Sequence, residues 1–191
     1  GSIANCVLPA ATAARGLTGF RMVDTVFGAL AQMVPDKVFA ASDGGNTNIS
    51  IGGYDAERRP YIFCDFTCAA WGGRSWADGL DGNSNMFANM AGQSVEVTEA
   101  EQPLKVEYYE LIGDRGGAGT FRGGVPFRRA YRFLGDEATI SVRSDRRTIR
   151  PYGLFGGYPG AASMNYISRG GGELEVLPAM FFDRLRHGDL F

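Results

Sequence analysis

The glycine-rich segments of this chain constrain its fold more than any other feature. Glycine accounts for 28 of the 191 residues, and doubled glycines are densest between Asp114 and Gly160. Glycine adopts positive φ without steric cost, and its missing side chain lets another backbone or a ligand approach closely. Strand-like stretches lie between these segments. The pattern therefore predicts shaped loops between strands rather than a flexible linker.

The clearest of these segments, residues 114–124, reads Asp-Arg-Gly-Gly-Ala-Gly-Thr-Phe-Arg-Gly-Gly. It has the flexibility of an anion-binding loop and carries arginines, but it lacks the Gly-Lys-Ser/Thr ending of a P-loop. It also joins two expected strands, so no helix N-terminus follows that would help to hold a phosphate. We therefore expect an interstrand turn in which Arg122 is braced against a carboxylate.

Apolar periodicity predicts one long helix over residues 17–34, ended by Pro35. A shorter helix is expected from Asn83 or Ser84 to Met90, and Arg169 to Gly172 resembles a hairpin turn. Strands are predicted at residues 48–51, 61–66, 106–112, 127–133, 138–142, 164–168 and 173–177. Because strands outnumber helices without a βαβ alternation, we expect an α+β fold of mainly antiparallel sheet, with a few helices and long glycine-rich loops.

Composition and charge narrow the class of protein. No shift in composition divides residues 1–191, so we expect one domain or a fragment of one. The net charge of −2 offers no basic excess for nucleic acid, and no long apolar stretch would span a membrane. Three cysteines are too few and odd in number for a disulfide framework, and no leader precedes them, so we expect a cytoplasmic protein. Cys64 and Cys68 are expected to be buried apolar side chains.

The usual catalytic constellations are mostly absent from the sequence. The single histidine, His187, lies near the C-terminus and is expected to be solvated, and no metal site can be built around it. No Gly-x-Ser-x-Gly elbow is present. The loop with Trp71, Arg74 and Asp78 has the mixture of aromatic and polar residues that lines pockets. Turn formation and core packing explain the same residues equally well.

A resemblance to a known family rests on motifs that follow one another along most of the chain. They are Gly28 to Gln32 with Pro35, Trp71-Gly72-Gly73 with Asp78-Gly79, Asp114 to Gly124, Ser144-Asp145-Arg146, and Pro151-x-Gly153. Together they resemble the hydantoinase B/oxoprolinase family, whose Asp-x-Gly-Gly-x-Gly-x-x-Arg-Gly-Gly motif is matched by residues 114–124. Because members of that family are much longer, the chain is similar to the C-terminal portion of a B-type subunit.

The resemblance implies a component of an ATP-dependent enzyme that opens cyclic amides such as hydantoins, 5-oxoproline or lactams. It implies an A-type partner subunit that binds ATP, and a divalent metal held by the remaining part of the B-type subunit, outside this chain. The resulting hetero-oligomer would act on a small molecule. A ketone carboxylase subunit and a non-catalytic docking subunit are the alternatives. Candidates for substrate or interface contacts are Trp71, Arg74, Asp78, Asp114, Arg122, Asp145 and Arg146.

Overall fold

The structure is a computed structural model that describes residues 1–2, 4–12 and 15–191. Two α-helices and eight strands make up its regular structure, with a 3₁₀ turn, η1, at Pro35–Lys37. The helices are α1 (Arg15–Leu30) and α2 (Val95–Glu101). The strands are β1 (Thr47–Tyr54), β2 (Pro60–Thr67), β3 (Leu104–Leu111), β4 (Phe127–Phe133), β5 (Glu137–Arg143), β6 (Asn165–Ser168), β7 (Leu174–Leu177) and β8 (Met180–Arg186).

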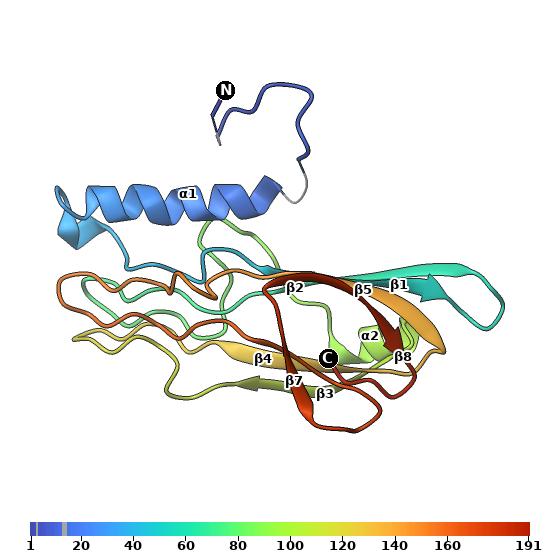
Figure 1. Ribbon diagram of the computed structural model, residues 1–191. Coiled ribbons are helices and arrows are strands. Elements are labelled where there is room, and N and C mark those ends of the chain that lie inside the picture. Colours follow the sequence, from blue (N-terminus) through green and yellow to red (C-terminus); the bar gives the residue numbers. More distant parts are fainter. Residues whose placement is uncertain (3, 13–14) are drawn as a thin grey trace.

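The strands form two layers, and Figure 1 shows one above the other. One layer is an antiparallel sheet with the strand order β2-β1-β5-β8. The other contains the antiparallel pairs β3-β4 and β6-β7. The C-terminal residues join these pairs, because the N–H of Tyr131 donates to the carbonyl of Phe191 and the N–H of Ser168 donates to Leu190. The α+β class with mainly antiparallel sheet is confirmed.

The core lies between the two layers. In β5, Ala138, Ile140 and Val142 point inward while the residues between them face outward, as the two-residue period of a strand requires. Phe133 and Ile140 are completely buried. The core consists of Ile49, Ile51, Phe63, Leu104, Tyr131, Phe133, Ala138, Ile140, Val142, Ile167 and Leu185.

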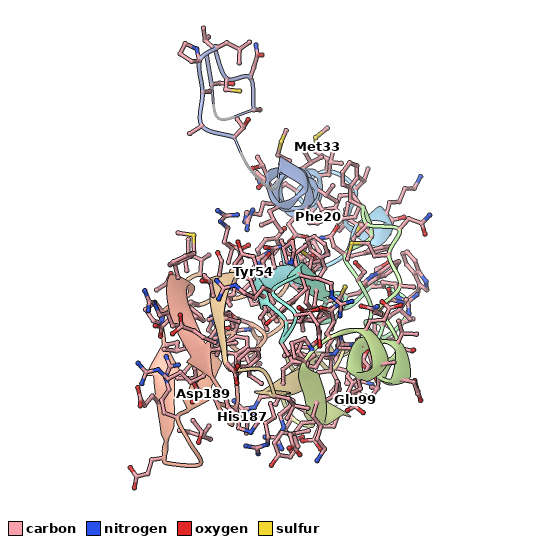
Figure 2. The ribbon with its side chains drawn as sticks, turned by 90° about the vertical axis from the view of Figure 1, so that its right-hand side faces the viewer. Phe20, Met33, Tyr54, Glu99, His187 and Asp189 are labelled. Atoms are coloured by element: carbon pink, nitrogen blue, oxygen red, sulfur yellow. The ribbon has the colours of Figure 1, made fainter. Side chains whose placement is uncertain are left out.

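Helix α1 lies outside these layers, above long loops at one end of the sheets (Figure 1). Figure 2 shows Phe20 pointing from the helix toward the body of the molecule and Met33 lying on the far side. Phe20 is buried, with an edge-to-face contact to Phe87, whereas Met33 is 78% exposed. No helix of the described residues has the length and apolar character needed to cross a membrane.

All seven predicted strands form, most of them one to three residues longer at an end than predicted. Helix α1 begins two residues before the expected start and ends at Leu30, four residues early. The hairpin turn is confirmed, since Gly170 and Gly171 adopt φ of 54° and 82° between β6 and β7. Strand β8 and helix α2 were not predicted. Ser94 caps α2 by accepting a hydrogen bond from Val97 N at 3.3 Å.

Two predictions were wrong. Residues 83–90 form no helix, because the Asn85 side chain bonds elsewhere: its amide donates to Ser42 Oγ at 2.7 Å, and its Oδ1 accepts from Phe87 N at 2.9 Å. Such side-chain bonds compete with helical ones. Cys64 is exposed and Cys68 is only half-buried. The inward positions of β2 are occupied by Phe63 and Asp65, so the strand period turns Cys64 outward.

Candidate functional site

The candidate site is a cavity of about 1250 Å³. Four loop segments supply much of its lining: residues 40–43, 67–75, 115–121 and 151–158. Strand residues between the two layers, such as Ile49 and Ala130, supply more of it. The four loop segments belong to the long loops that extend beneath α1, beyond the ends of the strands (Figure 1). Ligand clefts typically measure about 300–1,000 Å³, so this cavity is large enough for a small molecule. The loop from Trp71 to Asn83, in which the sequence predicted pocket residues, supplies part of its wall.

Close backbone packing holds these loops together. A side chain on Gly72 would overlap the carbonyl of Ala40, one on Gly117 the carbonyl of Tyr158, and one on Gly124 the carbonyl of Leu80. Hydrogen bonds connect the same segments: Ala40 N to Gly73 O at 2.9 Å, Gly124 N to Trp71 O at 2.8 Å, and Tyr158 N to Ala118 O at 2.8 Å. The doubled glycines are therefore needed for loop-to-loop contact.

The amides at the end of the 115–124 loop are used within the protein. Gly123 N donates to Gly117 O at 2.8 Å, and Val125 N donates to an oxygen of Asp81 at 2.7 Å. A phosphate cradle requires several such amides to point together at the ligand. Because these amides already donate within the protein, they do not form such a cradle. The loop instead shapes the cavity and joins β3 to β4.

Trp71 and Arg74 lie in the cavity wall. The Trp71 ring stacks on Phe39 with centroids 5.8 Å apart, and its indole N–H donates to the carbonyl of Ser84. Arg74 Nε donates to the carbonyl of Asp78 at 3.0 Å. Both of the interpretations that the sequence left open therefore hold for Trp71, which packs the loop and also lines the cavity.

Arg122 is braced against carboxylates, as the sequence predicted. Its Nη1 and Nη2 donate to the two oxygens of Asp81 at 2.7 and 3.1 Å, and its backbone N–H donates to Asp78 Oδ1 at 3.0 Å. The hydrogen bond from Arg122 lowers the pKa of Asp81 below its usual range. The Arg122 side chain is not among the residues that line the cavity, so we interpret it as a clamp between two wall segments.

Asp145 and Arg146 lie together at the opposite wall, whereas Asp114 lies apart from the cavity. Asp145 pairs with Arg21 of α1. Arg146 Nη2 contacts Asp24 Oδ2 at 2.5 Å, and its guanidinium lies over Gly44, where a side chain would collide with it. Asp114 is an exposed turn residue with φ of 57°.

A buried polar cluster surrounds Asp24. Ser42 donates to Asp24 from its backbone N at 3.2 Å and from its Oγ at 3.1 Å, and Asn85 donates to the same Oγ. Ser42, Asp24 and Asn85 are at most 4% exposed. Because buried polar groups are costly unless they are paired, this cluster fixes α1 against three loops.

Asp43 follows directly and lies in the cavity wall. One carboxylate oxygen accepts from Ala69 N at 3.0 Å and the other from Gly45 N at 3.4 Å. Burial raises the pKa of Asp43 to about 7, despite these two bonds, which lower it; the nearby Asp24 carboxylate adds to the rise. Asp43 is therefore the carboxyl group at this cavity that changes charge near neutral pH.

Replacing Asp43 by asparagine should flatten the pH dependence of stability. The unfolded carboxyl titrates near pH 4, so between about pH 4 and pH 7 the folded chain retains a proton that the unfolded chain has released. The free energy of unfolding of the parent chain should thus fall as pH rises through this window, by on the order of 2–4 kcal/mol from this group. Urea unfolding at pH 5 and pH 8 measures the difference. If the free energy of unfolding changed equally between pH 5 and pH 8 in the parent and in Asp43→Asn, the raised pKa of Asp43 would be contradicted.

The sequence did not single out Asp43, Ser42 or Asn85 for this site. Asp43 was predicted only as part of a turn, which is correct, since Gly44 and Gly45 adopt φ of 73° and 150°. His187 is exposed, as expected, with Nδ1 lying 2.9 Å from the carbonyl oxygen of Leu134. The described residues bring together no group of three or more His, Cys, Asp or Glu side chains that would hold a metal ion.

Known proteins are similar to this chain in sequence or in fold. A Methanocaldococcus jannaschii protein named only as uncharacterized is 37% identical over 159 residues, which is 83% of this chain and 27% of that protein. A Pseudomonas protein (strain NS671), assigned by name as the B-type subunit of a D-/L-hydantoinase, is 31% identical over 185 residues, covering 96% of this chain and 31% of its own length. This chain thus spans less than a third of each relative.

A solved structure of nucleotide-free acetone carboxylase, from a study of ATP-dependent acetone carboxylation, shares the fold with a TM-score of 0.65. The match covers 90% of this chain and 27% of that one, at 19% identity. The sequence profile of the hydantoinase B/oxoprolinase family matches residues 1–191. Because this match extends over all 191 residues, the chain belongs to the hydantoinase B/oxoprolinase family.

Proposed function

We propose that the chain is a component of an ATP-dependent enzyme that opens a cyclic amide, and that the cavity between its glycine-rich loops binds the substrate ring. The observation that carries this proposal is the cavity itself, with Asp43 in its wall. Family membership and the hydantoinase relative support the substrate class. ATP would be bound by an A-type partner subunit and would activate the amide carbonyl.

Opening a cyclic amide adds water to the carbonyl carbon and breaks the C–N bond, so the departing nitrogen must gain a proton. A general acid works best when its pKa lies near the working pH. The pKa of Asp43, raised to about 7 mainly by burial, meets that requirement. We assign Asp43 as the proton donor to the nitrogen. The two backbone N–H groups hold its carboxyl group in place.

The aromatic and glycine walls would orient the ring and exclude water. Trp71 supplies a flat apolar surface, and the 115–121 loop supplies backbone polar groups. The described residues do not fit a metal ion, as they form no ligand cluster. The divalent metal that such enzymes are expected to use would therefore be held by other parts of the assembly.

Replacing Arg122 by alanine should lower turnover of the complete assembly by about ten-fold or more, because its side chain would no longer join the cavity loop that ends at Phe121 to the turn at Asp81. Asp81 would then lose its fork of two charge-assisted bonds. Arg122→Lys, which preserves the charge but loses the fork, should give an intermediate value. Steady-state ATP hydrolysis with substrate present measures the effect. Parent-like turnover in Arg122→Ala would show that the clamp is not needed.

A ketone carboxylase subunit is the second candidate, because the acetone carboxylase structure shares the fold. A non-catalytic docking subunit is the third. The complete assembly, purified with and without this chain, separates these cases when ATP hydrolysis is measured with hydantoins, 5-oxoproline, lactams, and ketones plus bicarbonate. Stimulation by the cyclic amides supports the first proposal, and stimulation by ketones supports the second. If ATP turnover and product formation persisted without the chain, only the third candidate, a non-catalytic docking subunit, would remain.

A further inference from the structure

The outer face of the β2-β1-β5-β8 sheet has an ordered pattern of side chains. Toward one end of the face the two central strands carry small or polar residues, whereas the two edge strands carry large apolar ones; Tyr54, which is 67% exposed, lies at the other end of β1. The central residues are Asn48, Ser50 and Gly52 of β1 and Thr139 and Ser141 of β5. The apolar residues are Ile62 and Phe66 of β2 and Met180 and Phe182 of β8, which are 70%, 42%, 69% and 75% exposed.

The strand register places these residues in rows across the sheet. One row runs Phe66, Asn48, Arg143, Met180, and the next runs Cys64, Ser50, Ser141, Phe182. Apart from Arg143, the face thus has a band of short side chains between two apolar ridges, of which the one on β8 consists of Met180 and Phe182 and is continued by Arg184 and Arg186. Strands in a sheet lie about 4.8 Å apart, so the ridges are about 14 Å apart. An α-helix with its side chains is about 10 Å wide and fits between them.

This face is uncovered and carries positive charge at one edge. In Figure 1 it looks upward, to the right of α1, and no other element of the described chain lies over it. Arg143, Arg184 and Arg186 are exposed on β5 and β8, against one acidic residue, Glu137, which lies 3.6 Å from Arg184. The β2 side of the face carries no charged residue between Pro60 and Phe66, because Asp65 points inward.

We propose that this face binds an amphipathic α-helix of a partner polypeptide. The apolar side of that helix would pack over Ser50 and Ser141 and between the two ridges. Acidic residues along one edge of it would meet the arginines of β5 and β8, which fixes its direction. Large exposed apolar surfaces of this kind mark interaction sites.

A second copy of this chain does not suit the face. Two such faces laid together would offer Arg143, Arg184 and Arg186 no acidic partner beyond Glu137, which already lies near Arg184 of its own copy. The helices that a second copy offers are also unsuitable, because α1 exposes only uncharged residues over its described positions 16–30 and α2 has only seven residues. A partner of complementary charge is therefore the better occupant.

Photocrosslinking in the complete assembly tests the proposal. The probe is p-benzoylphenylalanine placed at Ser141, with a second variant at Thr139. We expect adducts within one partner polypeptide, at positions three or four residues apart, in a segment that carries Asp or Glu. Adducts to a second copy of this chain or to a segment without helical spacing would overturn the proposal. The absence of adducts at both positions would do so as well.

Charge reversal gives an independent test. Arg143→Glu should weaken association of the chain with the rest of the assembly by about ten-fold or more, and added salt should reduce the difference. Lys37→Glu, an equal change of charge on the exposed η1 turn, is the matched control and should have less than a two-fold effect. Cys64, exposed on the same face, should react with N-ethylmaleimide at least ten-fold more slowly in the assembly than in the separated chain. Equal binding of the two charge variants, or unchanged reactivity of Cys64, would contradict the proposal.

Discussion

Replacing Asp65 by alanine is expected to lower the free energy of unfolding by about 3–5 kcal/mol, among the largest effects of any single change in this chain. Asp65 and Arg129 form an ion pair of 2.8 Å in which each side chain is only 5% exposed. Tyr131 also donates to the same carboxylate oxygen at 2.5 Å. Without Asp65, the Arg129 guanidinium would be buried between the layers with no opposite charge.

The neighbours of this pair cannot compensate for its loss. Arg129 stacks over the Tyr109 ring at 3.8 Å, which holds the guanidinium in place. Burial and the Asp65 carboxylate raise the pKa of Tyr131 well above its usual range, so the phenol stays neutral. Since small domains are stable by only about 5–15 kcal/mol, a loss of this size would remove a large part of the stability of the chain.

Urea unfolding measures this prediction, and a double variant controls for the loss of packing. Asp65→Leu combined with Arg129→Met removes both charges and fills the space with apolar atoms, so it should unfold at a higher urea concentration than Asp65→Ala. If Asp65→Ala lost less than about 1 kcal/mol, the pair would not be buried as the structure shows. If the single and the double variant lost the same free energy of unfolding, the effect would come from changed packing and not from the unpaired Arg129 charge.

Replacing Gly117 by alanine should destabilise the loops that form the cavity, by about 1–3 kcal/mol or more. The new methyl group would overlap the carbonyl of Tyr158, which belongs to the backbone and cannot rotate away. The 115–121 and 151–158 segments would have to separate, and the bond from Tyr158 N to Ala118 O would lengthen. Substrate-dependent turnover of the assembly should fall by more than ten-fold.

Gly113→Ala is the matched control, because it adds the same methyl group to the same loop. Nothing lies within 4 Å of that position, and its backbone does not adopt the left-handed conformation. This variant should be as stable and as active as the parent. If both variants behaved alike, in unfolding and in turnover, close packing at Gly117 would not be what shapes the cavity.

Local patterns in the sequence were sufficient to predict most of the fold. Alternation in residues 138–142 placed β5, and its inward side chains form the core. The doubled glycines predicted interstrand loops, and Arg122 was correctly expected to meet a carboxylate. The last strand predicted from the sequence was β7. β8 was missed, although Met180 to Arg186 partly alternate between inward and outward residues.

The candidate site was harder to predict because its parts lie far apart in the chain. Arg146 contacts Asp24 across 122 residues, a pairing that no local pattern reveals. Asp43 reads as an ordinary turn residue, and its raised pKa arises from burial in the folded chain and from the nearby Asp24 carboxylate, 19 residues away in the sequence. Asn85 was interpreted as part of a helix, whereas its side chain donates a hydrogen bond to Ser42 in the buried cluster around Asp24.

Photoaffinity labelling of the complete assembly tests the central claim most directly. A hydantoin or lactam bearing a diazirine, irradiated in the presence of ATP, reports which residues surround the bound ring. The account predicts adducts within residues 40–43, 67–75, 115–121 or 151–158, which line the cavity. Unlabelled substrate should suppress these adducts. Substrate-protected adducts that lie only outside this chain would contradict the claim that its glycine-rich loops form the substrate site.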